Sequence, residues 1–172
     1  DEFFGEWVDD CKQGKGVWKA SNGESYEGEW AQDKKNGKGK YVYVDGSVYE
    51  GSFKDDNKAG KGTFTYADNS RYIGDFLDDK RHGNGREEWP DGTYFIGLYS
   101  KGVKKGKGTF VWASGAKYEG EFSNNEIHGT GEHYWPGGKT YKGTWRNNMM
   151  HGRGILDFGD GRVYEGEFVD DR

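Results

Sequence analysis

The sequence predicts an all-β protein, an elongated single-layer antiparallel meander of tandem β-hairpins. Three observations predict this fold: a 23-residue unit recurs without insertion, side-chain character alternates within each unit, and glycines recur at fixed positions. Alternation with a period of two is that of a strand, whose successive side chains point to opposite faces. Units this short cannot bury a core alone, so they must stack on their neighbours.

Each unit follows one plan. It opens with an aromatic residue, any residue, glycine, any residue and a second aromatic residue, as in YEGEW at Tyr26. A loop of six residues is expected next, then Gly-x-Gly, then alternating aromatic residues and a turn. We expect one repeat array over residues 1–172, excised from a longer protein. Its units open at residues 3, 26, 49, 72, 95, 118, 141 and 164.

In the unit that opens at Tyr26, one hairpin register agrees with the residue patterns of both strands. It places rings and glycines on one face and glutamates opposite lysines on the other. Glycine in a strand often marks the close approach of another group, here the neighbouring rings. The register pairs Trp30 with Gly37, Gly28 with Gly39, Tyr26 with Tyr41, Glu29 with Lys38, and Glu27 with Lys40.

A turn joins each unit to the next. Pairs such as Asp45-Gly46 between aromatic runs are strong hairpin signals. The rings stay on one face only if this connection has an odd number of residues or a bulge. Both alternatives remain open at this point, and either gives about 15 strands in one meander.

Composition and charge exclude several classes of function. Only 31% of the residues are hydrophobic, yet 17% are aromatic, which is typical neither of a closed core nor of a disordered chain. The net charge of −5 disfavours nucleic-acid binding. Cys11 is the single cysteine, which fits a reducing compartment. We therefore expect a cytoplasmic location, with cytoskeletal or membrane association as a further expectation.

Two motifs resemble nucleotide-binding or metal-binding motifs, but neither has the residues or spacing that such a site needs. Gly-x-Gly lacks the third glycine and the following helix of a nucleotide fingerprint. His82, His128 and His151 share one repeat position, but equivalent positions lie about 10 Å or more apart. Zinc ligands lie about 2 Å from the metal, so these histidines cannot share one. We predict no enzyme, no metal site and no cofactor.

The aromatic face is the candidate site, because a one-layer sheet leaves it without cover. Contiguous exposed apolar surface marks interfaces, and Trp and Tyr are preferred hot-spot residues. Ala20, Glu87 and His133 interrupt the rings and would give the face local specificity or a bend. The predicted partner-binding residues are Trp30, Tyr41, Tyr43, Phe53, Tyr66, Phe76, Trp89, Tyr99, Trp112, Phe122, Trp135 and Trp145.

Two further groups are candidates for contacts. Lys101, Lys104 and Lys105 lie in an expected loop from Ser100 to Lys105, which is either simply solvated or contacts an acidic partner or a lipid headgroup. Met149 and Met150 lie in another expected loop, as exposed apolar candidates for self-association.

The units resemble MORN repeats. The matching motifs are the YEGEW, YEGSF and YEGEF openings, the HGNG, HGTG and HGRG segments, and the WPDG turn at Trp89. The resemblance covers essentially the whole chain. It implies tandem hairpins and a scaffold or adaptor role in cytoskeletal, junctional or signalling proteins, in which some members clasp an extended partner segment and some self-associate.

Residues and resemblance together predict a non-catalytic scaffold or adaptor. It would bind an extended segment of a partner protein through the aromatic face and form a homodimer through its terminal repeats. The alternative is a peripheral phospholipid-binding module, which the net acidity disfavours. The identity of the partner stays open.

Overall fold

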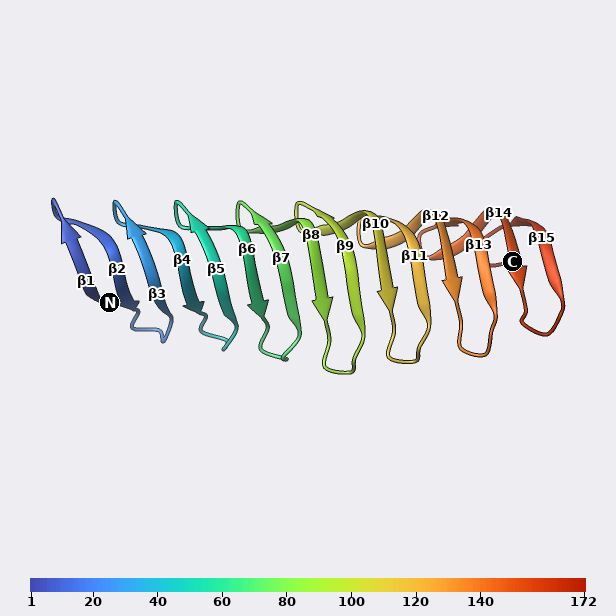
Figure 1. Cartoon of the computed structure of the whole chain (residues 1–172), viewed down its shortest axis with the longest axis horizontal. Coiled ribbons are helices and arrows are strands. Elements are labelled where there is room, and N and C mark those ends of the chain that lie inside the picture. The colour runs from blue at the N-terminus through green and yellow to red at the C-terminus, as the bar shows by residue number, and fades with distance from the viewer. The chain divides into compact units, whose positions relative to one another are not determined.

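A computed structural model describes residues 1–172 and contains strands but no helix. Fifteen strands form one open sheet whose strand order follows the chain, so each strand lies next to its neighbours in sequence (Figure 1). The predicted all-β meander of tandem hairpins is confirmed. No helix of a length and hydropathy that would cross a membrane is found.

The chain divides into two compact units, residues 1–85 and 86–172. The first unit contains β1 (Glu2–Val8), β2 (Cys11–Lys19), β3 (Ser25–Ala31), β4 (Lys34–Val42), β5 (Val48–Lys54), β6 (Asn57–Thr65), β7 (Arg71–Leu77) and the start of β8 (Lys80–Glu88). The second contains the end of β8 and β9 (Tyr94–Ser100), β10 (Val103–Val111), β11 (Lys117–Ser123), β12 (Glu126–Tyr134), β13 (Thr140–Arg146), β14 (Met149–Asp157) and β15 (Val163–Phe168).

A two-residue turn closes the hairpin within each repeat. Between β3 and β4 it consists of Gln32 and Asp33, whose φ angles are 49° and 66°. Two consecutive positive φ values are those of a type I′ turn, whose twist matches that of the flanking strands. The expected six-residue loop is therefore wrong, because the strands continue to the turn.

A bulge in β4 accounts for the residues of the expected loop that the two-residue turn does not use. Gly28 faces Gly39 as predicted, but Trp30 faces Lys35 rather than Gly37, so β4 holds two extra residues. Gly37 has a φ of 97° there, and the Glu29 carboxylate accepts the backbone N–H of Lys38 at 2.5 Å. The glutamate of the opening motif therefore caps the bulge as well as facing solvent.

The connection between repeats has three residues, which settles the alternative left open by the sequence. After β4 these are Val44, Asp45 and Gly46, enclosed by a hydrogen bond from the Tyr43 N–H to the Ser47 carbonyl of 2.9 Å. Gly46 has a φ of 87°. The odd number of residues keeps the rings on one face.

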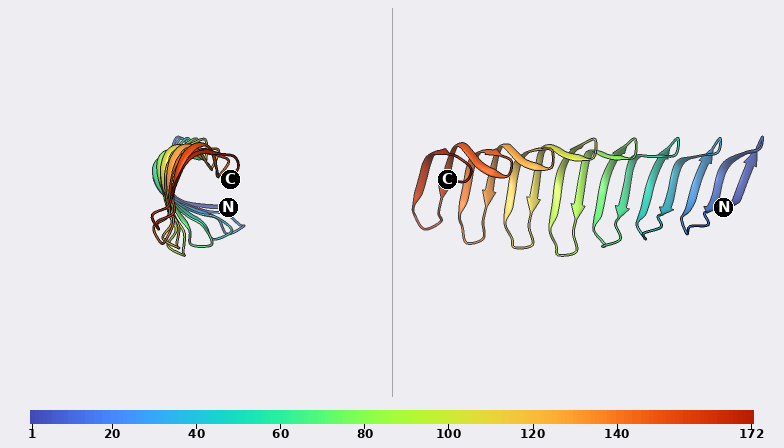
Figure 2. Two further views of the ribbon diagram at one scale, coloured as in Figure 1. Left: turned by 90° about the vertical axis from the view of Figure 1, so that its right-hand side faces the viewer. Right: turned by 180° about the vertical axis from the view of Figure 1, so that it is seen from behind.

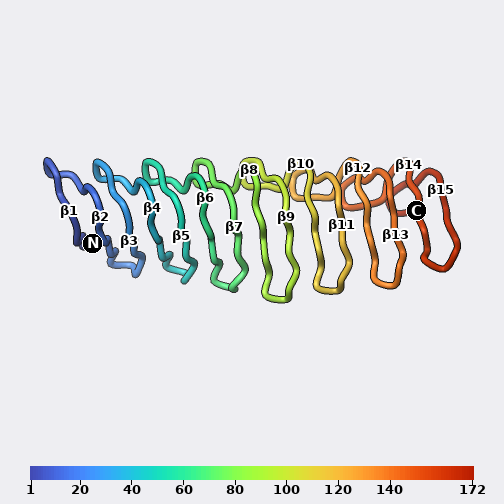
Figure 3. The backbone as a smooth tube through the Cα atoms, in the orientation of Figure 1, coloured from blue at the N-terminus to red at the C-terminus, as the bar shows by residue number.

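The two kinds of connection alternate between opposite ends of the strands (Figure 3). Within each unit the strands bend along their length (Figure 2). The rings that open the repeats and those that follow Gly-x-Gly occupy one face of this single layer. Their burial comes from the arrangement described next.

Candidate functional site

The first aromatic row consists of the two rings that open each repeat. The Tyr26 side chain is fully buried, and its ring lies on the backbone of the glycine pair Gly28–Gly39. Its hydroxyl donates to the Glu29 carbonyl at 2.9 Å. Burial raises the pKa of Tyr26 to about 12, so the hydroxyl stays a donor at neutral pH.

Edge-to-face contacts join the first row across repeats. The Tyr26 ring lies 5.1 Å from Trp30 in its own repeat and 5.1 Å from Phe53 in the next. Such pairs add about 0.5–1.5 kcal/mol to the effect of burial alone. The row therefore holds neighbouring repeats together. Its buried members are Tyr26, Trp30, Tyr49, Phe53, Tyr72 and Phe76 in the first unit, and Phe95, Tyr99, Tyr118, Phe122, Tyr141, Trp145 and Phe168 in the second. In the first and last repeats, Trp7 and Tyr164 are exposed.

Half of the predicted partner-binding rings belong to this row. Their side chains are only 3–6% exposed. The indole N–H of Trp30 donates to the Gly16 carbonyl, and that of Trp145 to the Gly131 carbonyl. These side chains are occupied inside the sheet, which corrects the expectation that they face a partner, except that Trp145 also borders the hollow described below. They are Trp30, Phe53, Phe76, Tyr99, Phe122 and Trp145.

The second aromatic row comes from the end of the Gly-x-Gly strands and the residue after them, and it is partly exposed. In the first unit Tyr41 and Tyr43 lie 4.5 Å apart, and Tyr43 lies 5.4 Å from Phe64 of the next repeat. These rings are tilted stacks rather than edge-to-face pairs. The other predicted partner-binding rings all lie here: Tyr41, Tyr43, Tyr66, Trp89, Trp112 and Trp135.

In the second unit this row is rich in tryptophan. Trp112 lies 4.6 Å from Phe110 and 5.2 Å from His133, and His133 lies 4.1 Å from Trp135. His133 thus continues the stack instead of interrupting it.

A side chain two residues before each Gly-x-Gly lies against both rows. The Lys35 ammonium is 5.8 Å from the centre of Tyr26, 5.5 Å from that of Tyr41, and 3.2 Å from Asp56. We call these side chains the cover positions. Their parity along the strand, which equals that of the glycines, could have revealed them. They are Lys12, Lys35, Lys58, Arg81, Lys104, Ile127 and Met150.

The predicted interruption at Glu87 is a buried ion pair. Its carboxylate accepts hydrogen bonds from the Tyr99 hydroxyl at 2.5 Å and from the Lys104 ammonium at 3.1 Å. The Lys104 ammonium also lies 5.0 Å from the centre of the Phe95 ring. A buried charge needs such a partner to offset the loss of hydration.

A hollow of about 380 Å³ lies among the second-row tryptophans of the second unit. At this hollow the Nδ1 atom of His133 is buried and has no hydrogen-bond partner. Burial lowers the pKa of His133, and the charge of Lys139 lowers it further, so the ring is neutral near pH 7. The hollow is lined by Trp112, Ile127, His133, Trp135 and Trp145, with Asn148, Met150 and Asp171 completing it.

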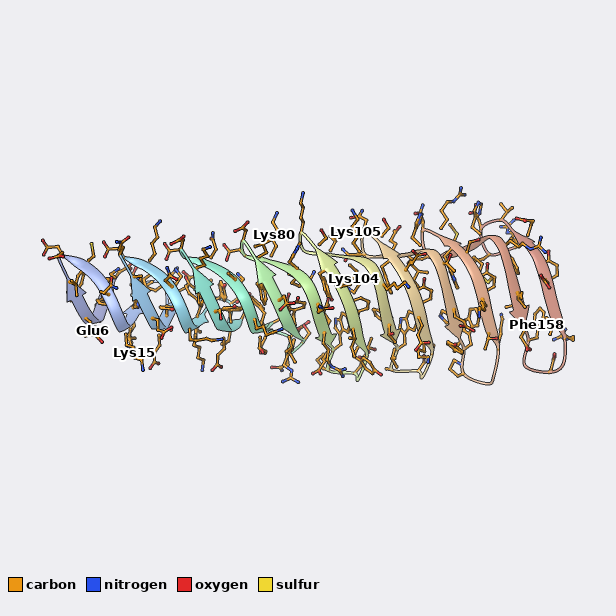
Figure 4. All side chains as sticks on the ribbon, turned by 45° about the horizontal axis from the view of Figure 1, so that its top comes forward. Glu6, Lys15, Lys80, Lys104, Lys105 and Phe158 are labelled. Carbon is orange, nitrogen blue, oxygen red and sulfur yellow. The ribbon has the colours of Figure 1, made fainter.

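The basic and methionine candidates lie elsewhere than expected. Lys101 is exposed in the turn after β9, but Lys104 and Lys105 belong to β10, where successive side chains alternate between faces (Figure 4). Lys104 is buried in its ion pair, and Lys105 is exposed. Met149 and Met150 lie in β14 rather than in a loop, and Met150 is buried at a cover position. Lys104 and Met150 are therefore unavailable for the contacts predicted for them.

The histidines that share a repeat position stay apart. His82, His128 and His151 lie on three different strands, β8, β12 and β14. No three His, Cys, Asp or Glu side chains converge in a metal-binding geometry.

Comparison with known proteins identifies the repeat. The family model described as "MORN repeat" matches seven consecutive segments, at residues 3–25, 26–48, 49–71, 72–94, 95–117, 118–140 and 141–161. No match is found among curated protein sequences.

Solved structures show a related fold. One is the SAS-4 TCP domain of Drosophila melanogaster in complex with a proline-rich motif of Ana2, with a TM-score of 0.52 and 17% identity over 88% of this chain and 83% of that one. Another is a mutant TCP10 domain of Danio rerio CPAP, with a TM-score of 0.34 and 14% identity over 89% and 82%. At such identities the first likeness concerns the fold alone.

Proposed function

Because the chain belongs to the MORN-repeat family, we propose that it is a non-catalytic scaffold that binds an extended segment of a partner protein along its second aromatic row. The observation that carries this proposal is the division between the two rows. First-row rings are buried between repeats, whereas second-row rings are partly exposed on a sheet with a single layer. Contiguous apolar surface of this kind usually marks an interface.

The fold neighbour supports a protein partner. The SAS-4 TCP domain was solved with a proline-rich motif of another protein. One sheet with a related fold therefore binds a peptide segment. We propose that the present chain does the same.

Trp112 and Trp135 are the residues on which we expect binding to depend most. They flank the neutral His133 ring and line the hollow of the second unit. Tryptophan is the most enriched residue among interface hot spots, where truncation costs about 2 kcal/mol or more. The remaining second-row rings, Tyr41, Tyr43, Tyr66 and Trp89, would extend the contact surface.

Few observations favour a phospholipid as the partner. Recognition of anionic headgroups generally uses clusters of about 4–8 basic residues. The ion pair of Lys104 with Glu87 leaves only Lys101 and Lys105 of the predicted basic group, on a chain of net charge −5. We therefore treat lipid binding as an alternative that the experiment below distinguishes from protein binding.

The experiment compares partner capture by the wild-type chain and by the double variant Trp112→Ala/Trp135→Ala. Cell extract is passed over each immobilised chain, bound proteins are identified by mass spectrometry, and the affinity of each is then measured with purified partner. We expect the double variant to lose at least 30-fold in affinity, in line with the hot-spot cost of about 2 kcal/mol.

Trp7→Ala is the matched control, because Trp7 is exposed but lies outside the second row, on β1. Circular dichroism verifies that each variant keeps its sheet. Equal affinity of the wild-type chain and the folded double variant would reject the proposal. Co-sedimentation with anionic vesicles that survives the double substitution would favour the lipid alternative instead.

A further inference from the structure

The cover positions separate the repeats into two classes. Five of them carry a cation: Lys12, Lys35, Lys58, Arg81 and Lys104. Where the position is Lys58, its ammonium lies 5.7 Å from the centre of the Tyr43 ring and 5.6 Å from that of Phe64. These second-row rings are thus already in contact with a cation of their own chain.

Ile127 and Met150 replace the cation in the next two repeats. Both are buried, and both border the hollow that contains Trp112 and Trp135. The residues at this hollow are therefore apolar where the corresponding residues of other repeats bring an ammonium group. The His133 ring between the two tryptophans is neutral. A cation does contact one end of this stack, since the Lys139 ammonium lies 4.8 Å from the centre of the Trp135 ring, but none lies at the two cover positions.

The tryptophans also differ between the rows. The first-row indoles of Trp30 and Trp145 donate to carbonyls of the sheet. The second-row indoles of Trp112 and Trp135 have no such bond within the chain. They are therefore available to donate to carbonyl groups of a bound segment.

The spacing of the second row suits one backbone conformation in particular. Equivalent rings in successive repeats are two strands apart, a distance of about 9.6 Å. A polyproline II helix presents the same face every three residues, or about 9.3 Å. An extended β-strand repeats its face about every 6.7 Å, and an α-helical turn rises about 5.4 Å, so neither matches one ring per repeat as well.

We propose that the hollow of the second unit binds a polyproline II segment with proline at every third residue, its successive prolines packing on Trp112 and Trp135. Proline is compact and apolar, which suits the part of the hollow formed by Trp112, Ile127 and Met150, while Asn148 and Asp171 lie among its other lining residues. Polyproline II has no internal hydrogen bonds, so its carbonyls can accept from the two indoles. The inference rests on the proposed function and names the chemistry of its partner.

Two synthetic peptides of one composition test the spacing. Both have 12 residues of proline, glutamine and serine, one with three prolines placed three residues apart and the other with them four apart. The four-residue spacing turns each proline about a third of a turn from the one before, so no two of them share a face. Isothermal titration with the wild-type chain is expected to give at least tenfold tighter binding of the first peptide. Equal affinities, or no binding of either peptide, would overturn the inference.

Ile127→Lys tests the site, because it restores the cation that five other repeats carry at the cover position. We expect it to weaken binding of the three-spaced peptide at least tenfold. Glu126→Lys is the matched control, since it places the same side chain at the exposed neighbouring position on the opposite face of β12. Unchanged binding by folded Ile127→Lys would contradict the placement.

The two proposals fail in distinguishable ways. If Trp112→Ala/Trp135→Ala abolishes capture of a natural partner while proline spacing has no effect, the scaffold function stands and the polyproline II inference falls. If the double variant captures the partner as well as the wild-type chain, the scaffold proposal falls at its own test.

Discussion

Gly39 has an ordinary strand conformation, and its role is to leave room for the Tyr26 ring. A Cβ atom there would overlap the tyrosine hydroxyl and ring carbons. Gly46 is needed for a different reason: its surroundings are open, but its φ is 87°. The two kinds of glycine therefore respond differently to substitution.

Gly39→Ala is expected to lower the free energy of unfolding by about 1–3 kcal/mol, because the ring must move off the backbone. Urea denaturation measures the change. Gly46→Asn is the control, since Asn69 occupies the equivalent turn position of the next repeat with a φ of 68°. Equal stability of both variants would show that the rings do not depend on bare backbone beneath them.

His133 gives the fold a defined pH dependence. Burial lowers its pKa in the folded chain below the usual value of 6.5, so the unfolded chain takes up the proton first as the pH falls. The stability that depends on neutral His133 is therefore fully present above about pH 6.5, declines below it, and levels off below the lowered pKa.

His133→Phe removes this titration while keeping a ring in the stack. As the pH falls below about 6.5, we expect the wild-type chain to lose unfolding free energy that the variant keeps. The variant therefore becomes more stable relative to the wild-type chain. Urea denaturation at a series of pH values measures it. A difference that is constant with pH would show that folding leaves the pKa of His133 unchanged.

At the scale of the elements, the turn of one repeat is fastened to the strand of the previous one. The Lys35 N–H donates to the Asp56 carboxylate at 2.8 Å, and the Asp56 N–H donates to the Lys35 carbonyl at 2.9 Å. Asn125 makes the same bond to the N–H of Lys104, and Asn148 to that of Ile127. The turn residue thus closes the hairpin and links it to its neighbour.

Asp56→Ala is expected to cost about 2 kcal/mol of unfolding free energy, because it leaves a backbone N–H without its acceptor and an alanine at a φ of 71°. Asp56→Asn keeps the acceptor and tolerates this φ, so it should lose far less. Thermal or urea unfolding of both variants measures the contrast. Equal losses would assign the effect to the Lys35–Asp56 ion pair instead of the hydrogen bond.

The hairpins and most of their pairing could be predicted from sequence. Alternation places the rings and the strand glycines on the same face, and a ring needs a glycine beneath it, so only one register fits. The pairing of Gly28 with Gly39 and Tyr26 with Tyr41 follows from this restriction. The bulge at Gly37 could not, since it changes the pairing of Trp30 without changing parity. The two-residue turns carry a signal of their own in pairs such as Asp55-Asp56 and Asn124-Asn125, because Asp and Asn tolerate positive φ.

At the scale of the molecule, the aromatic face was predictable but its division into two rows was not. Trp30 and Trp112 have equivalent parity, although one ends an opening motif and the other follows Gly-x-Gly, so alternation alone assigns both to the same face. Their burial differs because Trp30 packs between the openings of neighbouring repeats, whereas Trp112 lies at the end of a strand beside the longer loop. That difference depends on contacts between repeats, which a single repeat sequence does not contain.

Fluorine NMR of the chain labelled with 5-fluorotryptophan can show whether one aromatic row is buried between repeats while the other is open to solvent. A soluble gadolinium chelate broadens resonances according to their access to solvent, and all seven tryptophans report at once. We expect strong broadening at Trp89, Trp112 and Trp135, which are partly exposed, with the buried Trp30 and Trp145 nearly unaffected. Broadening of Trp30 and Trp145 as strong as that of the second-row tryptophans would contradict it.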